Sequence, residues 1–407
     1  MGFSAGEHAE LLQLQDVVRY DECNNQGRGG ARHLSSVLPA VSAAIGSPIS
    51  TAMHADAGLL RAELNFPKVD SAIVVLIDGM GFWNIVDRKG HAPYLRSLLS
   101  NRDNDTPISS CVPSTTVAAM GVFGTGTCPG LTGMTGYSQL HPQRREISQM
   151  IKFTGDINPE EFQRQSTIFE ALRDNGVCAT SVGLPQFAHS ALTRAALRGS
   201  TYVAGSHPRA RIDAAAQASY ESGLTYLYIR DADKMGHQYG WDNQRWIGTF
   251  ERIDSQLRSL ASKAKPGTLI VITADHGMIN SNPASRIDIA QHEQLKRDVE
   301  LIGGEPRAVS LYLYSDVNPH DVKNRWLDYL GDKVAVYTKQ EAIDAGIYGL
   351  VNEQTRHILG DIIVFANNDV TVVDSRTQQD MATRLPSVHG SMTAAELDIP
   401  LFVDIAE

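Results

Sequence analysis

The sequence predicts an α/β protein: a central, mostly parallel sheet flanked by helices, with a smaller α+β subdomain inserted into it. Over residues 71–280, apolar strands alternate with helical segments, which is the pattern of parallel strands joined by helical crossovers. From Asn280 onward, shorter strands and helices break this alternation. A last apolar run, Ile399–Ile405, then returns to the pattern of the core.

The 407 residues are enough for two or three domains, or for one large core with insertions. We predict an α/β core from residues 71–280 and 371–407, which would carry the functional site. Residues 281–370 would form the inserted α+β cap, and Asp361–Phe365 and Val370–Val373 are expected to pair as a hairpin. Residues 1–70 would be a helical extension packed on the core, with Glu7–Tyr20 helical and Asn24–Gly30 a loop.

The net charge of −10 argues against a surface that coats nucleic acid or binds an anionic membrane. It leaves room for one anionic substrate, because bound cations would reverse the local sign. The sequence has no apolar stretch of membrane-spanning length, no signal-peptide pattern, and four cysteines without CxxC spacing. We therefore expect a cytoplasmic protein with no membrane and no nucleic-acid polymer as partner, and the oligomeric state stays open.

The first indication of a site is the run Asp275-His276-Gly277, which follows the apolar strand Leu269–Ile272 almost at once. A carboxylate and an imidazole are costly to leave unpaired at the end of a buried strand, and a divalent metal would satisfy both. Alone, the run fits equally well an aspartate that caps the next helix and a histidine on the surface.

The same arrangement recurs along the chain. Asp78 follows the strand Ser71–Ile77, and Asp233 follows another apolar strand, four residues before His237. His389 lies in a Ser-Val-His-Gly turn near the C-terminus. Open α/β sheets place their sites at the carboxyl ends of the strands, so these side chains are expected to meet. Mixed carboxylate and imidazole ligands suit zinc best, with manganese or iron as alternatives, and there are enough groups for two ions.

Two metal ions about 3.5–4 Å apart clamp the attacking and leaving oxygens of a phosphoryl displacement. A hydroxyl bound to zinc is deprotonated near neutral pH and can serve as the nucleophile. Thr116 is the candidate, because it stands at the start of a predicted helix, Val117–Phe123. The N-terminus of that helix would add N–H donors for a phosphate group.

The ordered set of motifs resembles the alkaline phosphatase superfamily, and most closely its type I phosphodiesterase/nucleotide pyrophosphatase branch. The matching motifs are Leu76-Ile-Asp78-Gly79, Pro113-Ser-Thr-Thr116 through Thr125-Gly126, Asp233-Lys-Met-Gly236-His237, Ala274-Asp275-His276-Gly277-Met278 and His389-Gly390. The resemblance implies an alkaline-phosphatase-like fold with two zinc ions. It places Asp78, Asp275, His276 and Thr116 on one ion, and Asp233, His237 and His389 on the other.

The resemblance also implies the reaction. Thr116 would attack phosphorus in line and form a phosphothreonine, which water then hydrolyses. We expect a hydrolase that acts on phosphodiester or nucleotide pyrophosphate bonds of a small phosphorylated substrate, with nucleotides among the candidates. Phosphomonoesterase, phosphonate hydrolase and phosphotransferase activities on the same core are the alternatives, and a metal-stabilised binding module without turnover is the third hypothesis.

Some residues compete with this assignment or depart from the branch. Ser114 and Thr115 are rival nucleophiles, but only Thr116 has the branch's spacing to both Pro113 and Thr125. Asp231 is spaced wrongly for the metal motif. Cys111 begins a segment that echoes the sulfatase maturation motif, which needs an arginine where Thr115 stands. Tyr137 stands where eukaryotic members carry a phosphate-binding asparagine, and Thr132-Gly133 where a His-Gly pair is common, so the substrate class stays open.

Overall fold

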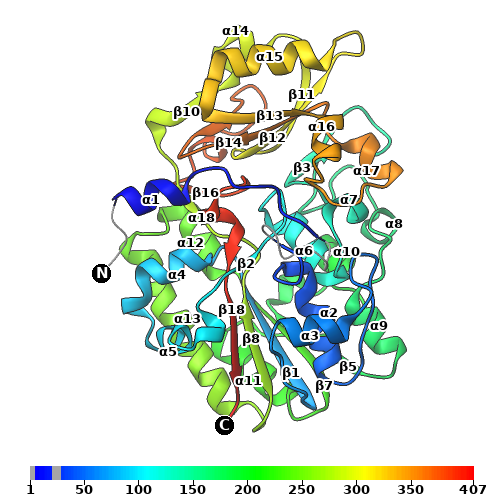
Figure 1. Ribbon diagram of the computed structural model, residues 1–407, viewed down its shortest axis with the longest axis vertical. Coiled ribbons are helices and arrows are strands. Elements are labelled where there is room, and N and C mark those ends of the chain that lie inside the picture. Colours follow the sequence, from blue (N-terminus) through cyan, green and yellow to red (C-terminus); the bar gives the residue numbers. More distant parts are fainter. Residues whose placement is uncertain (1–4, 21–28) are drawn as a thin grey trace.

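The computed structural model describes residues 5–20 and 29–407, and its largest element is a six-stranded sheet of order β18-β8-β1-β7-β5-β6 (Figure 1). Five strands pair in parallel, and β18 at one edge runs antiparallel to β8. The strands are β1 (Ser71–Ile77), β5 (Cys178–Gly183), β6 (Thr201–Ala204), β7 (Gly223–Ile229), β8 (Leu269–Thr273) and β18 (Leu401–Ile405). The mostly parallel sheet expected from the alternating pattern is confirmed.

Strand β1 lies near the centre of this sheet, between β7 and β8. All seven of its residues are buried, as a continuous apolar run predicts for a strand covered on both faces. Its register places Ile77 opposite Ile229 of β7 and Leu76 opposite Thr273 of β8. The carboxyl ends of these three strands therefore lie side by side at one edge of the sheet.

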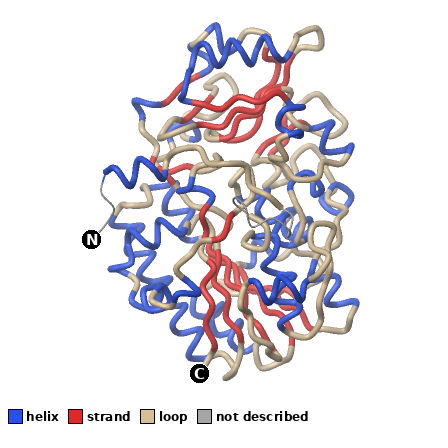
Figure 2. The backbone as a smooth tube through the Cα atoms, viewed as in Figure 1, coloured by secondary structure: helices blue, strands red, loops and turns tan. Residues whose placement is uncertain are grey.

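Helices cover both faces of the sheet (Figures 1 and 2). One layer contains α4 (Phe82–Arg88), α5 (Pro93–Leu99), α11 (Pro208–Ala218), α12 (Asp231–Tyr239) and α13 (Gln244–Lys263). The other contains α2 (Leu34–Ala44), α3 (Ala57–Glu63), α6 (Thr116–Thr125), α9 (Ile168–Asp174) and α10 (Ala191–Ala196). In α13, the buried residues Trp246, Phe250, Ile253 and Leu257 recur every three to four positions, which is the apolar stripe of a helix packed on one side.

A second sheet, of order β11-β12-β14-β13, lies beyond the carboxyl edge of the first (Figure 1). Its antiparallel strands are β11 (Val299–Glu305), β12 (Ala308–Leu313), β13 (Val334–Thr338) and β14 (Ile362–Ala366). The helices around it are α14 (Glu293–Lys296), α15 (Pro319–Leu330), α16 (Lys339–Asp344) and α17 (Glu353–Ile358). Trp326, Leu311 and Val364 belong to a hydrophobic cluster of this region that is separate from the cluster under the large sheet.

The hairpin expected from Asp361–Phe365 and Val370–Val373 is wrong. Strand β14 pairs with β12 and β13, whereas β15 (Thr371–Val373) pairs in parallel with β10 (Arg286–Asp288). The turn between the two runs is present, but β14 already has a neighbour on each side, so no edge of it is left for β15.

Two short antiparallel pairs connect the distant parts of the chain. Strand β9 (Ile279–Asn280) pairs with β16 (Ser387–Val388), and β2 (Ile108–Ser109) pairs with β17 (Asp398–Ile399). A third pair, β3 (Ser138–Leu140) and β4 (Ile147–Gln149), follows the short helix α7 (Pro129–Thr132), and α8 (Pro159–Phe162) follows that pair. The β9–β16 pair brings the segments on its two sides together.

The N-terminal region differs from its prediction. Helix α1 covers only Ala5–Leu11, so the helix expected for Glu7–Tyr20 ends early, and the chain continues extended with Leu14 bridged to Thr393. Helix α2 is the buried element of this region and packs against α6. Most of the loop expected at Asn24–Gly30 lies outside the described residues. The predicted domain boundaries remain a prediction.

Within residues 5–20 and 29–407, none of the helices combines the length and the apolarity that a membrane crossing needs. Three cysteines lie in the described part of the chain and all are free: Cys111 and Cys128 are buried, and Cys178 is exposed.

Candidate metal centre

The carboxyl ends of three adjacent strands carry most of the predicted site. Asp78 is the first residue after β1, and Asp275 and His276 follow β8 within three residues. Asp233 lies in the first turn of α12, just after β7, and its N–H donates to the Asp78 carbonyl oxygen at 3.0 Å. The parallel register of β1, β7 and β8 is therefore what brings these acids together.

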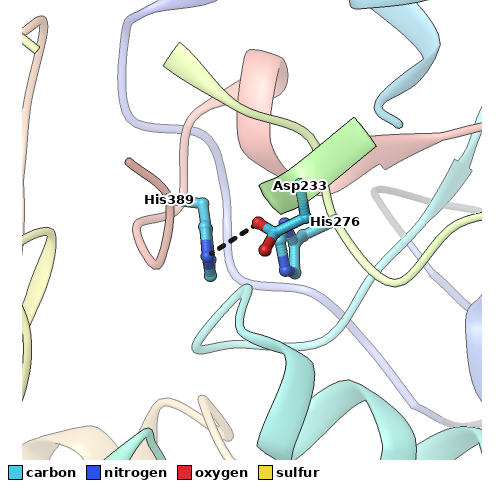
Figure 3. A group of neighbouring side chains, drawn as sticks. All are labelled: Asp233, His276 and His389. Atoms are coloured by element: carbon cyan, nitrogen blue, oxygen red, sulfur yellow. Dashed lines mark ion pairs between the residues drawn. The ribbon is translucent and has the colours of Figure 1, made fainter. Parts of the chain in front are cut away.

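His389 reaches the same place from the far end of the chain. The β9–β16 pair sets Ile279 opposite Val388, so the residues just before β9 and just after β16 become neighbours. The rings of His276 and His389 stack with centroids 3.6 Å apart and planes at 14°. Figure 3 shows the His389 imidazole directed at the Asp233 carboxylate, with His276 beside it.

The first group of donors consists of Asp78, Asp275 and His276, which offer one atom each within 4.8 Å of one another. His276 Nε2 lies 3.6 Å from Asp78 Oδ1 and 3.5 Å from Asp275 Oδ2. All three side chains are buried. Asp275 Oδ1 accepts from the N–H groups of Gly79 and His276 at 3.0 Å each, whereas Asp275 Oδ2 is buried without a hydrogen-bond partner.

The second group is centred on Asp233. His237 Nε2 lies 3.1 Å and His389 Nε2 3.7 Å from Asp233 Oδ1, an oxygen that is buried and receives no well-aligned hydrogen bond. Asp233, His276 and His389 each offer one donor atom within 4.8 Å of the others, so His276 belongs to both groups. His237 contacts this second group through Asp233. This group is more open, because the His237 side chain is 27% exposed and Asp233 18%.

The histidine tautomers are set by backbone carbonyl groups, which can only accept hydrogen bonds. Nδ1–H of His237 donates to Ser387 O at 2.8 Å, Nδ1–H of His389 to Ser114 O at 2.9 Å, and Nδ1–H of His276 to Gly277 O at 3.1 Å. In the neutral rings each Nε2 then carries a lone pair that faces a carboxylate oxygen. Two facing lone pairs repel unless a cation lies between them, and metal-binding histidines are oriented in this manner.

The pKa directions agree with a demand for cations. Burial, followed by the Asp275 and Asp233 carboxylates, raises the pKa of Asp78 well above its usual range. Burial lowers the pKa of His237, but the adjacent Asp233 outweighs this effect and raises it to about 9. Burial, together with His276 and His237, lowers the pKa of His389 well below its usual range, so that ring stays neutral. The raised pKa values of the Asp78 carboxyl and the His237 imidazole both indicate that added positive charge would stabilise the site.

A glycine makes the close approach of β1 and α12 possible. Gly79 has φ +70°, and a Cβ atom built on it would lie 2.9 Å from both Cα and Cβ of Asp233. Asp78 therefore supplies a carboxylate to the site, and Gly79 leaves the space in which Asp233 lies next to it.

Thr116 is the first residue of α6 and is half-buried. Its Oγ1 lies 3.2 Å from His276 Nε2 and 3.4 Å from Asp78 Oδ1, so the hydroxyl faces the first donor group. The N-cap residue Thr115 makes no side-chain capping bond, and the first N–H groups of any α-helix lack intrahelical partners. The Thr116 hydroxyl therefore lies beside both the N–H groups in the first turn of α6 and the acids of the first donor group.

The competing residues lie in other environments. The Ser114 hydroxyl donates to Ser391 O at 2.7 Å and is buried. Asp231 forms an ion pair with Arg211, 3.6 Å apart. Cys111 is buried with its Sγ at 3.5 Å from Pro113 O, and burial raises the pKa of its thiol far above the usual range.

Two side chains at the site were missed by sequence reasoning. The Tyr228 hydroxyl donates a short hydrogen bond to Asp78 Oδ2. Tyr228 is the last residue but one of β7, which pairs with β1, but no motif in the sequence marks it. The Glu305 carboxyl is also buried close to the site. No local pattern marks it, because it comes from the other sheet.

Comparison with protein families matches residues 72–392 to the type I phosphodiesterase/nucleotide pyrophosphatase family. Among solved structures, murine ectonucleotide pyrophosphatase/phosphodiesterase 5 is similar with a TM-score of 0.64 and 16% identity, over 81% of this chain and 87% of that chain. Phosphonoacetate hydrolase from Sinorhizobium meliloti 1021, in complex with phosphonoformate, is similar with a TM-score of 0.63 and 20% identity, over 83% and 90%. A search of curated protein sequences gives no match.

The two structural likenesses show the fold, because this chain shares its arrangement of a central, mostly parallel sheet flanked by helices with both solved structures. The family match begins at the second residue of β1 and ends three residues after His389, so it includes every predicted site residue. The chain therefore belongs to the type I phosphodiesterase/nucleotide pyrophosphatase family and is a hydrolase that acts on phosphoric ester bonds.

Proposed function

We propose that the protein hydrolyses phosphodiester or nucleotide pyrophosphate bonds of small substrates by a two-zinc mechanism, with Thr116 as the nucleophile. The observation that carries this proposal is the position of Thr116 Oγ1, 3.2 Å from His276 Nε2 at the start of a ten-residue helix. An inactive variant of the murine phosphodiesterase, in which a threonine is replaced by alanine, was solved in complex with AMP, which supports both the residue type and the substrate class.

The donor set fits two zinc ions. Asp78, Asp275 and His276 would hold one, and Asp233, His237 and His389 the other, with His276 adjacent to both. Asp275 Oδ2, which is buried without a hydrogen-bond partner, and Asp233 Oδ1, which faces the Nε2 atoms of His237 and His389, are the clearest signs that these groups need a cation. When bound, zinc ions supply Lewis acidity that lowers the pKa of a coordinated hydroxyl and offsets charge on phosphoryl oxygens. Manganese and iron are the alternatives for this mixed set.

The chain's own residues would perform the remaining steps. The N–H groups in the first turn of α6 point toward an anion placed at its N-terminus and fix the phosphoryl group. Thr116 Oγ1 forms a bond to phosphorus as its proton leaves to water, and the bond from phosphorus to the leaving oxygen breaks. In the second step a water oxygen attacks the phosphothreonine and Thr116 Oγ1 departs with a proton. Tyr228 holds Asp78 in orientation through its hydroxyl.

Thr116→Ala is the test. Turnover of an aryl phosphodiester is expected to fall by at least about 1000-fold, because no other hydroxyl replaces the nucleophile, while zinc content measured by elemental analysis stays that of the wild type. Thr116→Ser keeps a hydroxyl and should retain measurable turnover, and Ser114→Ala should retain most of it. Full activity in Thr116→Ala would refute the mechanism.

A phosphonate hydrolase on the same core is the second candidate. The structural likeness to phosphonoacetate hydrolase is as strong as that to the phosphodiesterase, with TM-scores of 0.63 and 0.64. Comparing an aryl phosphodiester, a phosphomonoester and phosphonoacetate under one condition decides between the two. We further propose that the protein acts in the cytoplasm on small molecules, without a membrane or a nucleic-acid polymer as partner.

A further inference from the structure

Glu305 is a buried acid that the proposed reaction does not yet use. It is the last residue of β11, in the second sheet, and only 7% of its surface is exposed. Its Oε1 atom is buried and has no hydrogen-bond partner among the described residues. A buried carboxyl oxygen without a partner is costly, so its persistence calls for an explanation.

Three segments of the site enclose the Glu305 carboxyl. A Cβ atom built on Gly390, which follows His389 and has φ +133°, would lie 2.7 Å from Glu305 Cγ and 3.1 Å from its Cδ. A Cβ atom on Gly136, in the loop after α7, would lie 3.9 Å from Oε1. The Thr115 hydroxyl and the Tyr137 N–H also direct hydrogen bonds at this carboxyl, which lower its pKa. The acid therefore reaches from the second sheet to the rim of the N-terminus of α6.

The groups around Glu305 favour its neutral form. Burial raises the pKa of Glu305 to about 8, and Glu396 on α18 (Ala394–Leu397) adds to this effect. Thr115, the Tyr137 N–H and His237 act in the opposite direction but do not outweigh burial. The nearby Arg307 cannot neutralise Glu305, because its guanidinium is bound to Glu396 at 2.8 Å. A neutral carboxyl has one O–H donor, which a phosphoryl oxygen can accept.

We propose that Glu305 is a catalytic residue of this site, whose carboxyl group donates a hydrogen bond to a phosphoryl oxygen of the substrate. The proposal rests on the two-zinc phosphoryl-transfer function proposed above and adds a substrate contact from the inserted region. An ionised carboxylate at the same place would repel a phosphoryl group, whereas a neutral donor forms a charge-assisted bond with it. The N–H groups of α6 and this O–H would then hold the same group from two sides.

Four zinc-loaded proteins test the proposal: wild type, Glu305→Gln, Glu305→Ala and the control Glu300→Gln. Glutamine keeps a donor of the same length and should leave kcat/KM for an aryl phosphodiester within about 3-fold of wild type. Alanine removes the donor and should lower it about 10- to 100-fold with unchanged zinc content. Glu300 lies on the same strand but pairs with Arg145 at the surface, so Glu300→Gln should match the wild type.

A binding measurement separates this proposal from the function on which it rests. Calorimetry with inorganic phosphate needs no turnover, and Glu305→Ala should weaken phosphate binding by at least about 10-fold while Glu305→Gln preserves it. Unchanged kcat/KM and phosphate affinity in Glu305→Ala would overturn the proposal. Tighter phosphate binding in Glu305→Gln than in wild type would also overturn it, because it would show a repelling carboxylate. Loss of zinc from Glu305→Ala would also overturn the proposal, because it would show that the acid supports the metal ligands rather than the substrate.

The two hypotheses fail in different ways. A wild-type protein that turns over no ester, or a Thr116→Ala variant that keeps full activity, removes the proposed function whatever Glu305 does. A Thr116→Ala variant without turnover, combined with a fully active Glu305→Ala variant, removes only the role of Glu305.

Discussion

The two halves of the candidate metal centre are built differently. Asp78, Asp275 and His276 stand at the ends of neighbouring strands, and at most 7% of any of these side chains is exposed. Asp233, His237 and His389 come from α12 and from the turn after β16, and their side chains are 10–27% exposed. The first half is fixed by the register of the central sheet. The second depends on the docking of α12 and on the β9–β16 pair.

This difference has a consequence for metal binding. A donor group buried at the centre of a sheet cannot relax when one ligand is removed, whereas water can enter a partly exposed group and replace a missing ligand. We therefore expect that the loss of one ligand abolishes metal binding in the first half. In the second half, the same loss should only weaken the affinity for the ion.

The largest contrast should appear between Asp275→Asn and His237→Ala. The asparagine keeps the oxygen that accepts from Gly79 and His276 but loses the unpartnered oxygen, so kcat/KM should fall by at least about 1000-fold and stay low when zinc is added. In His237→Ala, kcat/KM should fall about 10- to 100-fold and recover with excess zinc. Zinc titrations of activity measure both. Equal recovery of the two variants would refute the proposed asymmetry.

A smaller effect should follow when the second sheet is uncoupled from α18. Arg307 and Glu396 form an ion pair whose side chains are both fully buried, and Arg307 also donates to Val370 O. Arg307→Ala leaves the Glu396 carboxylate buried without its positive partner, so the free energy of unfolding should fall by about 3–5 kcal/mol. Denaturant titration measures this fall.

The control for that variant is Arg297→Ala. Arg297 pairs with Asp298 at 3.6 Å on the surface of the same region, so its loss should cost about 0–1 kcal/mol. Similar costs for the two arginines would show that burial of the pair is not what holds the inserted region to the core.

The smallest effect should come from Tyr228→Phe, which removes the hydroxyl that orients Asp78. Groups that orient metal ligands typically contribute about 10- to 100-fold to metal affinity, and we expect zinc affinity of the first half to fall by that factor. Tyr226→Phe is the matched control, because Tyr226 lies two residues earlier on β7 and its hydroxyl only approaches the Met120 sulfur at 3.9 Å. Competition with a chromogenic chelator compares the two, and identical affinities would exclude an orienting role for Tyr228.

Much of the first half of the candidate metal centre could be predicted from the sequence. Continuous apolar runs identified β1, β7 and β8, and parallel strands end at one edge, so acids that follow them must meet there. Pairing within the inserted region was less readable. The Asp361–Phe365 and Val370–Val373 hairpin failed because the partners of β14 come from residues 308–313 and 334–338, which local turn chemistry does not specify.

The sequence by itself determined the parallel sheet, the acids and imidazoles that follow its strands, and the hydroxyl at the head of α6. These are local signals, since apolar periodicity and residue order are properties of short segments. Only the tertiary structure decided that His276 lies between the two donor groups, that Tyr228 holds Asp78, and that Glu305 reaches the rim from a second sheet. Those contacts join residues far apart in the chain, and their geometry follows from packing rather than from any local pattern.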